Sequence, residues 1–135
     1  MVTLEAILER NNLNRAYKQV KANRGGPGVD GMTVDELLDY LRAHAVEIVE
    51  TVKAGKYKPQ PVRRVMIPKE EKGKFRPLEI PTAVDRVIQQ AIAQKLSDEY
   101  EPVFSLHSHG FRPCRSCRTA IDEALDIANQ GYVWV

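Results

Sequence analysis

The chain has 135 residues, of which 43% are hydrophobic, and its formal net charge is +2. This size and composition fit one ordinary domain with its own core, and they exclude a disordered chain and a disulfide-dependent scaffold. No apolar run reaches the roughly 18 residues of a membrane span, and the N-terminus does not have the pattern of a signal peptide. With only two cysteines, three positions apart, and no export signal, we expect a protein of a reducing cytoplasm.

Charge is distributed unevenly along the chain. Residues 53–79 contain nine Lys or Arg against three Asp or Glu, and residues 104–119 contain three arginines and no acid. Residues 32–52, by contrast, contain five acids and one arginine. Such blocks favour a surface that binds a polyanion. Charge scatter on an ordinary solvated surface is the alternative.

The first third of the chain predicts helices. Residues 3–22 have apolar positions three and four apart, which indicates a helix that ends before the glycines at 25–28. Thr33 followed by Glu36 has the pattern of a capping box. We therefore predict a second helix, or a pair of helices, that begins at this box and runs to about residue 54.

Residues 61–81 predict a β-hairpin with a polar loop at 69–74, because β-favouring residues alternate on both sides of that loop. Pro68, Pro77 and Pro81 cannot donate hydrogen bonds to a neighbouring strand. The hairpin should therefore be an edge element or stand free of other strands.

The last third predicts two further helices and a strand. Thr82 is the expected N-cap of a helix that runs to about Tyr100, and Ser116 is the expected N-cap of a helix that Gly131 closes. Residues 132–135 are apolar and begin a strand. We expect an α+β fold, and we expect the sequence to be a fragment because it stops inside this strand.

Residues 107–117 read HSHGFRPCRSC and allow two interpretations. Two histidines and two cysteines at this spacing resemble a small zinc site. Two arginines with no acid between them instead suit phosphate. No second Cys/His pair elsewhere closes a two-knuckle site, so zinc is the weaker interpretation.

Two other stretches allow both a structural and a functional interpretation. Residues 25–31 lack the spacing of a P-loop and, taken alone, require no more than a helix stop and a turn. Lys69 and Arg76 lie on opposite arms of the predicted hairpin and would suit a triphosphate or a nucleic-acid backbone, although a solvated turn is the plain alternative. The chain has no evident nucleophile with its base, and no close carboxylates on an apolar strand that would hold two Mg²⁺.

Three stretches taken together resemble the fingers and upper palm of reverse transcriptases encoded by group II introns. They read GGPGVDGMTVDEL, VRRVMIPKEEKGKFRPLEIPTAVDRVIQQAIAQKL and EPVFSLHSHGFRPCRSCRTAI, in this order over essentially the whole chain. In that family the third stretch usually reads S-x-G-F-R-P-x-R-S. Here His109 stands at the usually aromatic position, Cys114 at the usually small one and Cys117 at a variable one. The resemblance implies that these are substitutions in a motif that binds no metal.

The resemblance also implies a reaction. The family synthesises DNA on an RNA template, with two Mg²⁺ held by aspartates on palm strands. One of these aspartates follows a strand like residues 132–135, and two more lie in a Tyr-x-Asp-Asp hairpin that this sequence lacks. The parent would be an RNA-directed DNA polymerase with Mg²⁺ as its cofactor, and the fragment would be inactive and bind no metal. Many such proteins are also maturases that promote splicing of their own intron RNA.

On this resemblance the chain has three parts. Residues 1–31 are the N-terminal helix and a loop on the template side, and residues 32–103 are the fingers. Residues 104–135 are the junction from fingers to palm, truncated before the catalytic strands. The expected partners are intron RNA, an RNA template, a DNA primer and deoxynucleoside triphosphates (dNTPs), with no membrane. A truncated fragment could also self-associate.

The resemblance assigns roles to individual residues, none of them catalytic or metal-binding. Lys69 and Arg76 would bind the incoming dNTP. The residues expected to contact template or intron RNA are Asn23, Gly25, Gly26, Arg63, Arg64, Ile80, Pro81, Arg86, Arg112 and Arg115. Two alternatives remain: a stand-alone RNA-binding module with the same basic face, and a zinc-dependent interaction domain.

Overall fold

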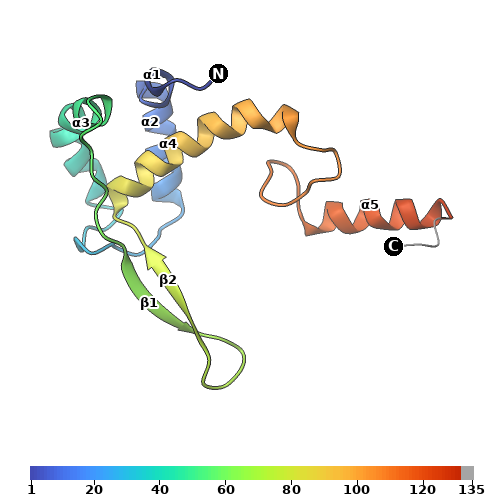
Figure 1. Ribbon diagram of the computed structural model, residues 1–135. Helices are drawn as coiled ribbons and strands as arrows, with labels where there is room; N and C mark the ends of the chain where they lie inside the picture. Colours follow the sequence, from blue (N-terminus) through green and yellow to red (C-terminus); the bar gives the residue numbers. More distant parts are fainter. Residues whose placement is uncertain (132–135) are drawn as a thin grey trace. The chain divides into compact units, whose positions relative to one another are not determined.

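The structure is a computed structural model, and it describes residues 1–131 (Figure 1). It combines helices with one two-stranded antiparallel sheet, so the predicted α+β class is confirmed. The strand predicted at residues 132–135 lies outside the described residues. The elements are α1 (Leu4–Ile7), α2 (Arg10–Ala22), α3 (Leu37–Lys53), β1 (Arg63–Pro68), β2 (Phe75–Ile80), α4 (Ala83–Tyr100), the 3-10 helix η1 (Glu101–Val103) and α5 (Cys117–Asn129).

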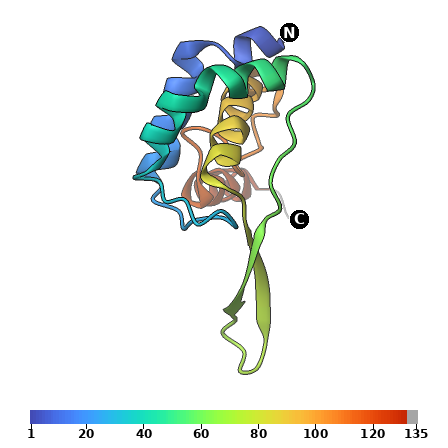
Figure 2. The same ribbon diagram turned by 90° about the vertical axis from the view of Figure 1, so that its left-hand side faces the viewer.

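The chain divides into two compact units, the first comprising Met1–Lys95 and the second beginning at Leu96. The core of the first unit lies between α2, α3 and α4. Ala16, Ala83 and Ala91 are fully buried there together with Leu37, and such small side chains let the helices approach closely. Figure 2 shows these helices grouped together, with the hairpin β1–β2 extending away from them.

The helix predicted over residues 3–22 is two helices, and this boundary was predicted wrongly. Helix α1 ends at Ile7 and α2 begins at Arg10. The buried side chain of Asn12 stabilises the break, because its amide donates to the carbonyl of Ile7 at 2.8 Å and to that of Ala91 at 3.0 Å. Gln94 in turn donates to the Asn12 amide oxygen at 2.8 Å. A carbonyl left open at a helix end thus receives a partner from within the core.

Helix α3 begins later than predicted. The carboxylate of Glu36 accepts hydrogen bonds from both the backbone N–H and the hydroxyl of Thr33, each at 2.8 Å. These bonds lower the pKa of the exposed Glu36. They close a turn, and the helix itself begins at Leu37. Its end is as predicted, since Gly55 follows the last turn at a φ of 66°.

The hairpin and the two later helices are confirmed. In the described part of the chain the sheet consists of β1 and β2 alone, which agrees with the expectation that it stands free. The Asp85 N–H donates to the Thr82 hydroxyl at 3.2 Å at the start of α4. Ser116 caps α5 in a reciprocal capping box with Thr119.

Candidate nucleic-acid interface

The hairpin has two chemically different faces. In an antiparallel pair, residues directly opposite each other lie on the same face. Arg63 is opposite Ile80 and Ile67 is opposite Arg76, so both arginines share a face with an apolar stretch between them. This cationic face carries three of the residues predicted to bind RNA or nucleotide: Arg63, Arg76 and Ile80.

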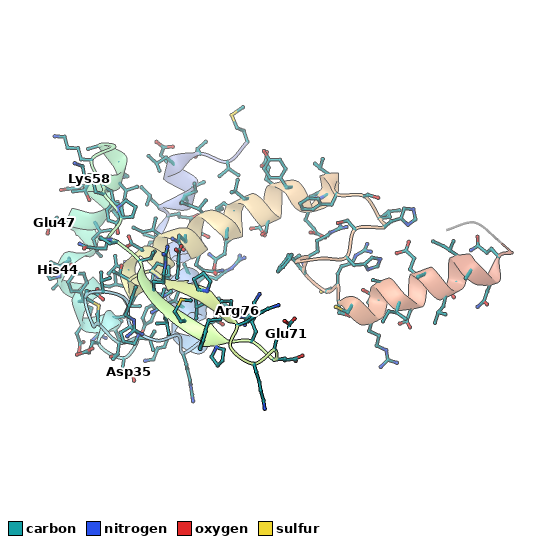
Figure 3. All side chains as sticks on the ribbon, turned by 60° about the horizontal axis from the view of Figure 1, so that its bottom comes forward. Asp35, His44, Glu47, Lys58, Glu71 and Arg76 are labelled. Atoms are coloured by element: carbon teal, nitrogen blue, oxygen red, sulfur yellow. The ribbon has the colours of Figure 1, made fainter. Side chains whose placement is uncertain are left out.

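The far end of the cationic face forms a pocket of about 460 Å³. Lys69 and Arg76 line it together with Glu70 and Glu71, and Figure 3 shows Arg76 on the hairpin and Glu71 in its loop. The Lys69 N–H donates to the Lys74 carbonyl at 2.8 Å, which holds Lys69 beside the second strand. Glu71 is paired with Lys74. The geometry therefore brings the two predicted dNTP ligands together in a pocket where one of the two acids is already paired.

Arg64 lies on the opposite face from Arg63. Its Nη2 donates to Glu79 across the sheet at 2.7 Å, and both side chains are largely exposed. An exposed pair of this kind adds little stability, but Glu79 compensates the positive charge of Arg64. The structure therefore separates Arg64 from the other predicted RNA contacts of the hairpin.

The glycine loop, residues 25–28, packs directly on the start of α4. A Cβ on Gly28 would lie 2.7 Å from Cα of Thr82, and one on Gly25 would overlap Nη1 of Arg86. The Nη2 of Arg86 donates to the carbonyl of Gly26 at 2.9 Å. A Cβ on Gly26 would lie 3.5 Å from Nη2 of Arg63. The loop, the base of the hairpin and the first turn of α4 are therefore neighbours.

This neighbourhood contains most of the predicted RNA contacts. They are Asn23, Gly25, Gly26, Arg63, Ile80, Pro81 and Arg86. A pocket of about 260 Å³ lies beside them, lined in part by Asn23, Arg86, Gln89 and Gln90. Amide and guanidinium groups supply the donors and acceptors that read base edges. The Nε of Arg86 is buried there without a hydrogen-bond partner.

Sequence reasoning missed Gln89, Gln90 and Asp85. The two glutamines follow Arg86 by three and four positions, which places them on the same helix face, so the helix prediction contained the signal for them. Asp85 follows Thr82 by three positions, and this spacing is typical of a helix cap, so it is a local signal for Asp85. The Asp85 carboxylate also accepts from the Tyr57 hydroxyl at 2.5 Å and from the Gln60 N–H at 3.0 Å. Nothing local in the sequence indicates those two contacts.

In the second unit, Arg112 is committed to its own loop. Its side chain is only 7% exposed and is paired with Glu101. The guanidinium donates to the Glu101 carboxylate from Nε at 3.1 Å and from Nη2 at 2.8 Å. The carbonyls of Ser105 and Ser108 accept from Nη1 at 2.7 and 2.8 Å, and that of Glu101 from Nη2 at 3.4 Å. All five N–H groups of the guanidinium have acceptors, so this geometry does not support the predicted contact of Arg112 with RNA.

Arg115 is held less completely than Arg112. Its Nη1 donates to the Leu106 carbonyl at 2.6 Å, and the side chain stays partly exposed. Arg115 therefore keeps donors that a phosphate could accept.

The two histidines of this unit share one carboxylate. His107 and His109 each contact a different oxygen of Glu123, and the second ring nitrogen of His109 lies 2.9 Å from the Thr119 hydroxyl. Hydrogen bonds from His107 and His109 lower the pKa of Glu123. Cys114 and Cys117 are exposed free thiols.

Residues 1–131 contain no group of three or more His, Cys, Asp or Glu side chains placed to hold a metal ion. The described residues therefore do not fit the Mg²⁺ expected for the parent enzyme. Within the same residues, no helix combines the length and the apolar character needed to cross a membrane.

Comparison with known proteins identifies relatives of the chain. No family model matches it. It is 43% identical over 106 residues to the group II intron-encoded protein LtrA of Lactococcus lactis subsp. cremoris, an alignment that covers 78% of this chain and 18% of LtrA. Protein YkfC of Escherichia coli (strain K12) is 41% identical over 120 residues, covering 87% of this chain and 31% of YkfC.

An uncharacterized 91 kDa protein in the cob intron of Schizosaccharomyces pombe is 34% identical over 135 residues, covering 95% of this chain and 16% of that protein. This chain thus spans less than a third of the length of each of these relatives. The similarity extends over most of the chain, and it reaches proteins of bacterial and of fungal introns. The chain belongs to the family of group II intron-encoded proteins.

Proposed function

We propose that this chain is the fingers region and the start of the palm of an RNA-directed DNA polymerase, a reverse transcriptase and maturase. In that enzyme it would bind template or intron RNA and the incoming dNTP. One observation carries the proposal. The strand register puts Arg63, Arg76 and Ile80 on one face of the hairpin, and the glycine loop lies beside Arg63.

The dimensions of this surface support the proposal. Ile80 and Pro81 supply a small apolar seat at the base of the hairpin, which suits the flat face of a base. Arg76 is four residues from Ile80 along β2, a separation of about 13 Å in a strand. An extended nucleoside triphosphate has a comparable reach. A templating base at the hairpin base and a triphosphate at Lys69 and Arg76 can therefore be held together.

The chemical step is assigned to other parts of the polymerase. In phosphoryl transfer a pair of metal ions stabilises the charge on the attacking and leaving oxygens. Within residues 1–131 no three His, Cys, Asp or Glu side chains lie together where they could hold such an ion. Under the proposal, the 135-residue chain extends no primer on an RNA template when Mg²⁺ and dNTPs are supplied. Extension by protein free of contaminating polymerase would contradict this part of the proposal.

Measurement of RNA binding tests the second part of the proposal, that this chain binds template or intron RNA. Fluorescence anisotropy with a labelled single-stranded RNA, measured over a series of salt concentrations, gives the dependence of affinity on salt. With about four phosphate contacts and a coefficient of about 0.7 per contact, the slope of log affinity against log salt should be about −3.

A matched pair of variants identifies the binding face. Arg63→Gln removes one cation of the cationic face and should reduce the steepness of the slope by about 0.7. Arg64→Gln, on the opposite face and already paired with Glu79, should leave the slope unchanged. An affinity that does not depend on salt, or equal effects of the two variants, would contradict the assignment of this face to RNA.

A further inference from the structure

Asp85 joins the two ends of the hairpin. It is 3% exposed, and its carboxylate accepts hydrogen bonds from Tyr57, Gln60 and Thr82 at 2.5, 3.0 and 2.7 Å. Tyr57 and Gln60 belong to the linker that enters β1, whereas Thr82 lies in the segment that leaves β2. A single buried carboxylate thus connects the chain before the hairpin to the chain after it.

The next residue holds a different segment. Arg86 donates to the carbonyl of Gly26 at 2.9 Å, and its guanidinium fills the space beside Gly25. Two successive residues in the first turn of α4 therefore hold the two parts of the candidate interface. Asp85 holds the base of the hairpin, and Arg86 holds the glycine loop.

The hairpin depends on such an anchor. A two-stranded ribbon is at best marginally stable by itself, and within residues 1–131 no third strand pairs with β1 or β2. Every residue of both strands except Ile67 and Ile80 is exposed. The direction in which the ribbon extends is therefore set at its base, where Asp85 lies.

We propose that Asp85 is a positioning residue that fixes the hairpin relative to the glycine loop, so that Arg63 and the loop present one continuous surface to RNA. The inference rests on the proposed function for its RNA contact and deepens it. A role limited to capping α4 would need only the bonds with Thr82. The bonds to Tyr57 and Gln60 span 28 and 25 positions of the sequence and contribute nothing to a helix cap.

The chemistry of the contact supports a permanent link. A buried carboxylate is unfavourable unless donors satisfy it, and here it has three. Burial raises the pKa of Tyr57, and its hydrogen bond to Asp85 adds to the rise. The phenol therefore keeps its proton, and acts as a donor, throughout the neutral range and well above it.

Distance measurements between spin labels test the positioning directly. Cys114 and Cys117 are exposed and would be replaced by serine. Labels would then be placed at Lys72→Cys in the hairpin loop and Lys18→Cys on α2, both exposed sites. The test variant is Tyr57→Phe, which removes one hydroxyl and keeps the ring. Tyr100→Phe, at the exposed end of α4, is the matched control.

We expect a narrow distance distribution in the parent protein and in Tyr100→Phe, and a broader one in Tyr57→Phe with unchanged helix content. RNA affinity should fall several-fold in Tyr57→Phe and stay at the parent value in Tyr100→Phe. Asp85→Asn keeps an acceptor for the Gln60 N–H and should lie between the parent and Asp85→Ala. If the Asp85 variants do not fold, Tyr57→Phe decides the question.

The two readouts separate the possible failures. An unchanged distance distribution in Tyr57→Phe would overturn the inference, and so would a broadened distribution with unchanged RNA affinity. If the parent protein itself binds no RNA, the proposed function fails and with it the RNA part of the inference. The distances would still decide whether Asp85 positions the hairpin.

Discussion

Gly28 and Thr82 are in direct backbone contact: a Cβ at position 28 would lie 2.7 Å from Cα of Thr82 and 2.8 Å from its nitrogen. Both atoms belong to the backbone at the start of α4, so neither can move aside as a flexible side chain would. Residue 28 must therefore be glycine for a steric reason, although its φ is not positive. The contact brings the glycine loop against the segment that leaves the hairpin.

Gly28→Ala should destabilise the protein by about 1–3 kcal/mol, the usual cost of forcing extra volume into a packed site. Urea unfolding followed by circular dichroism measures this. Gly26→Ala is the control in the same loop, because its nearest neighbour would be a side-chain atom at 3.5 Å. Equal stability of the two variants would show that the loop does not pack on α4 in this way.

Arg112→Lys should destabilise the second unit while leaving RNA binding unchanged. Lysine keeps the charge but cannot reproduce the planar set of donors that reaches Glu101 and the carbonyls of Ser105 and Ser108. Loss of such charged hydrogen bonds corresponds to about 1.5–3 kcal/mol, and thermal unfolding would detect it. Arg118→Lys, at a side chain that is 90% exposed, should have no effect on stability. If Arg112→Lys instead kept normal stability and bound RNA more weakly, the result would support the predicted contact of Arg112 with phosphate.

The stabilisation contributed by Glu123 should disappear in acid. Its pKa is lowered from the ordinary value of 4.5 by hydrogen bonds from His107 and His109. A carboxyl group with a lowered pKa contributes stability that is fully present above its unfolded pKa and is lost as the pH falls through its folded pKa. The melting temperature of the parent should therefore exceed that of Glu123→Gln at pH 5 and above.

The two melting temperatures should converge as the pH falls below about 4.5. Asp122→Asn, at the neighbouring exposed position on α5, serves as the control. A difference between parent and Glu123→Gln that stays the same at every pH would show that Glu123 acts through its shape alone.

Removal of metal should not affect folding. Cys114 and Cys117 are exposed, and His107 and His109 are both engaged by Glu123. A chelator, or the double variant Cys114→Ser with Cys117→Ser, should therefore leave the melting temperature nearly unchanged. A structural zinc site would behave otherwise, because its binding energy is part of the folding energy. A large loss of stability, or stoichiometric zinc in the purified protein, would favour the zinc-dependent interaction domain.

In a full-length enzyme that contains this chain, Lys69→Ala and Arg76→Ala should mainly impair the use of nucleotide. Each removes a charge-assisted contact to the triphosphate, worth about 1.5–3 kcal/mol. The kcat/KM for nucleotide should therefore fall roughly tenfold or more, with RNA affinity changed far less. Loss of RNA binding with normal nucleotide dependence would instead make the hairpin a clamp on the template.

The sequence predicted elements whose signals are local. The hairpin was predicted correctly because alternation and a polar loop lie within about 20 residues. Ser116 was predicted correctly as an N-cap because the apolar face of helix α5 begins a few residues after it. The break before Arg10 was missed because Asn12, which stabilises it, is satisfied by Ala91 and Gln94. Those partners are far away in the sequence and meet Asn12 only after the core has formed.

The same distinction holds within the candidate interface. Residue type alone made Arg63 and Arg112 look equivalent, since both are arginines in basic stretches. Glu101 lies 11 positions before Arg112, and only the folded loop brings the two together. Whether an arginine is available to bind RNA thus depends on the acceptors that the fold places around it. Counts of charge along the sequence do not contain this information.

The prolines of the hairpin have a consequence for self-association. The Lys69 N–H points inward to the Lys74 carbonyl, and inward and outward pairs alternate along an antiparallel ladder. Pro68 and Pro77 therefore occupy positions whose nitrogens face outward, one on each strand. Each outer edge of the ribbon lacks a donor at a point where a strand from another molecule would need one. Strand addition to this exposed ribbon is thus hindered at one position on each edge.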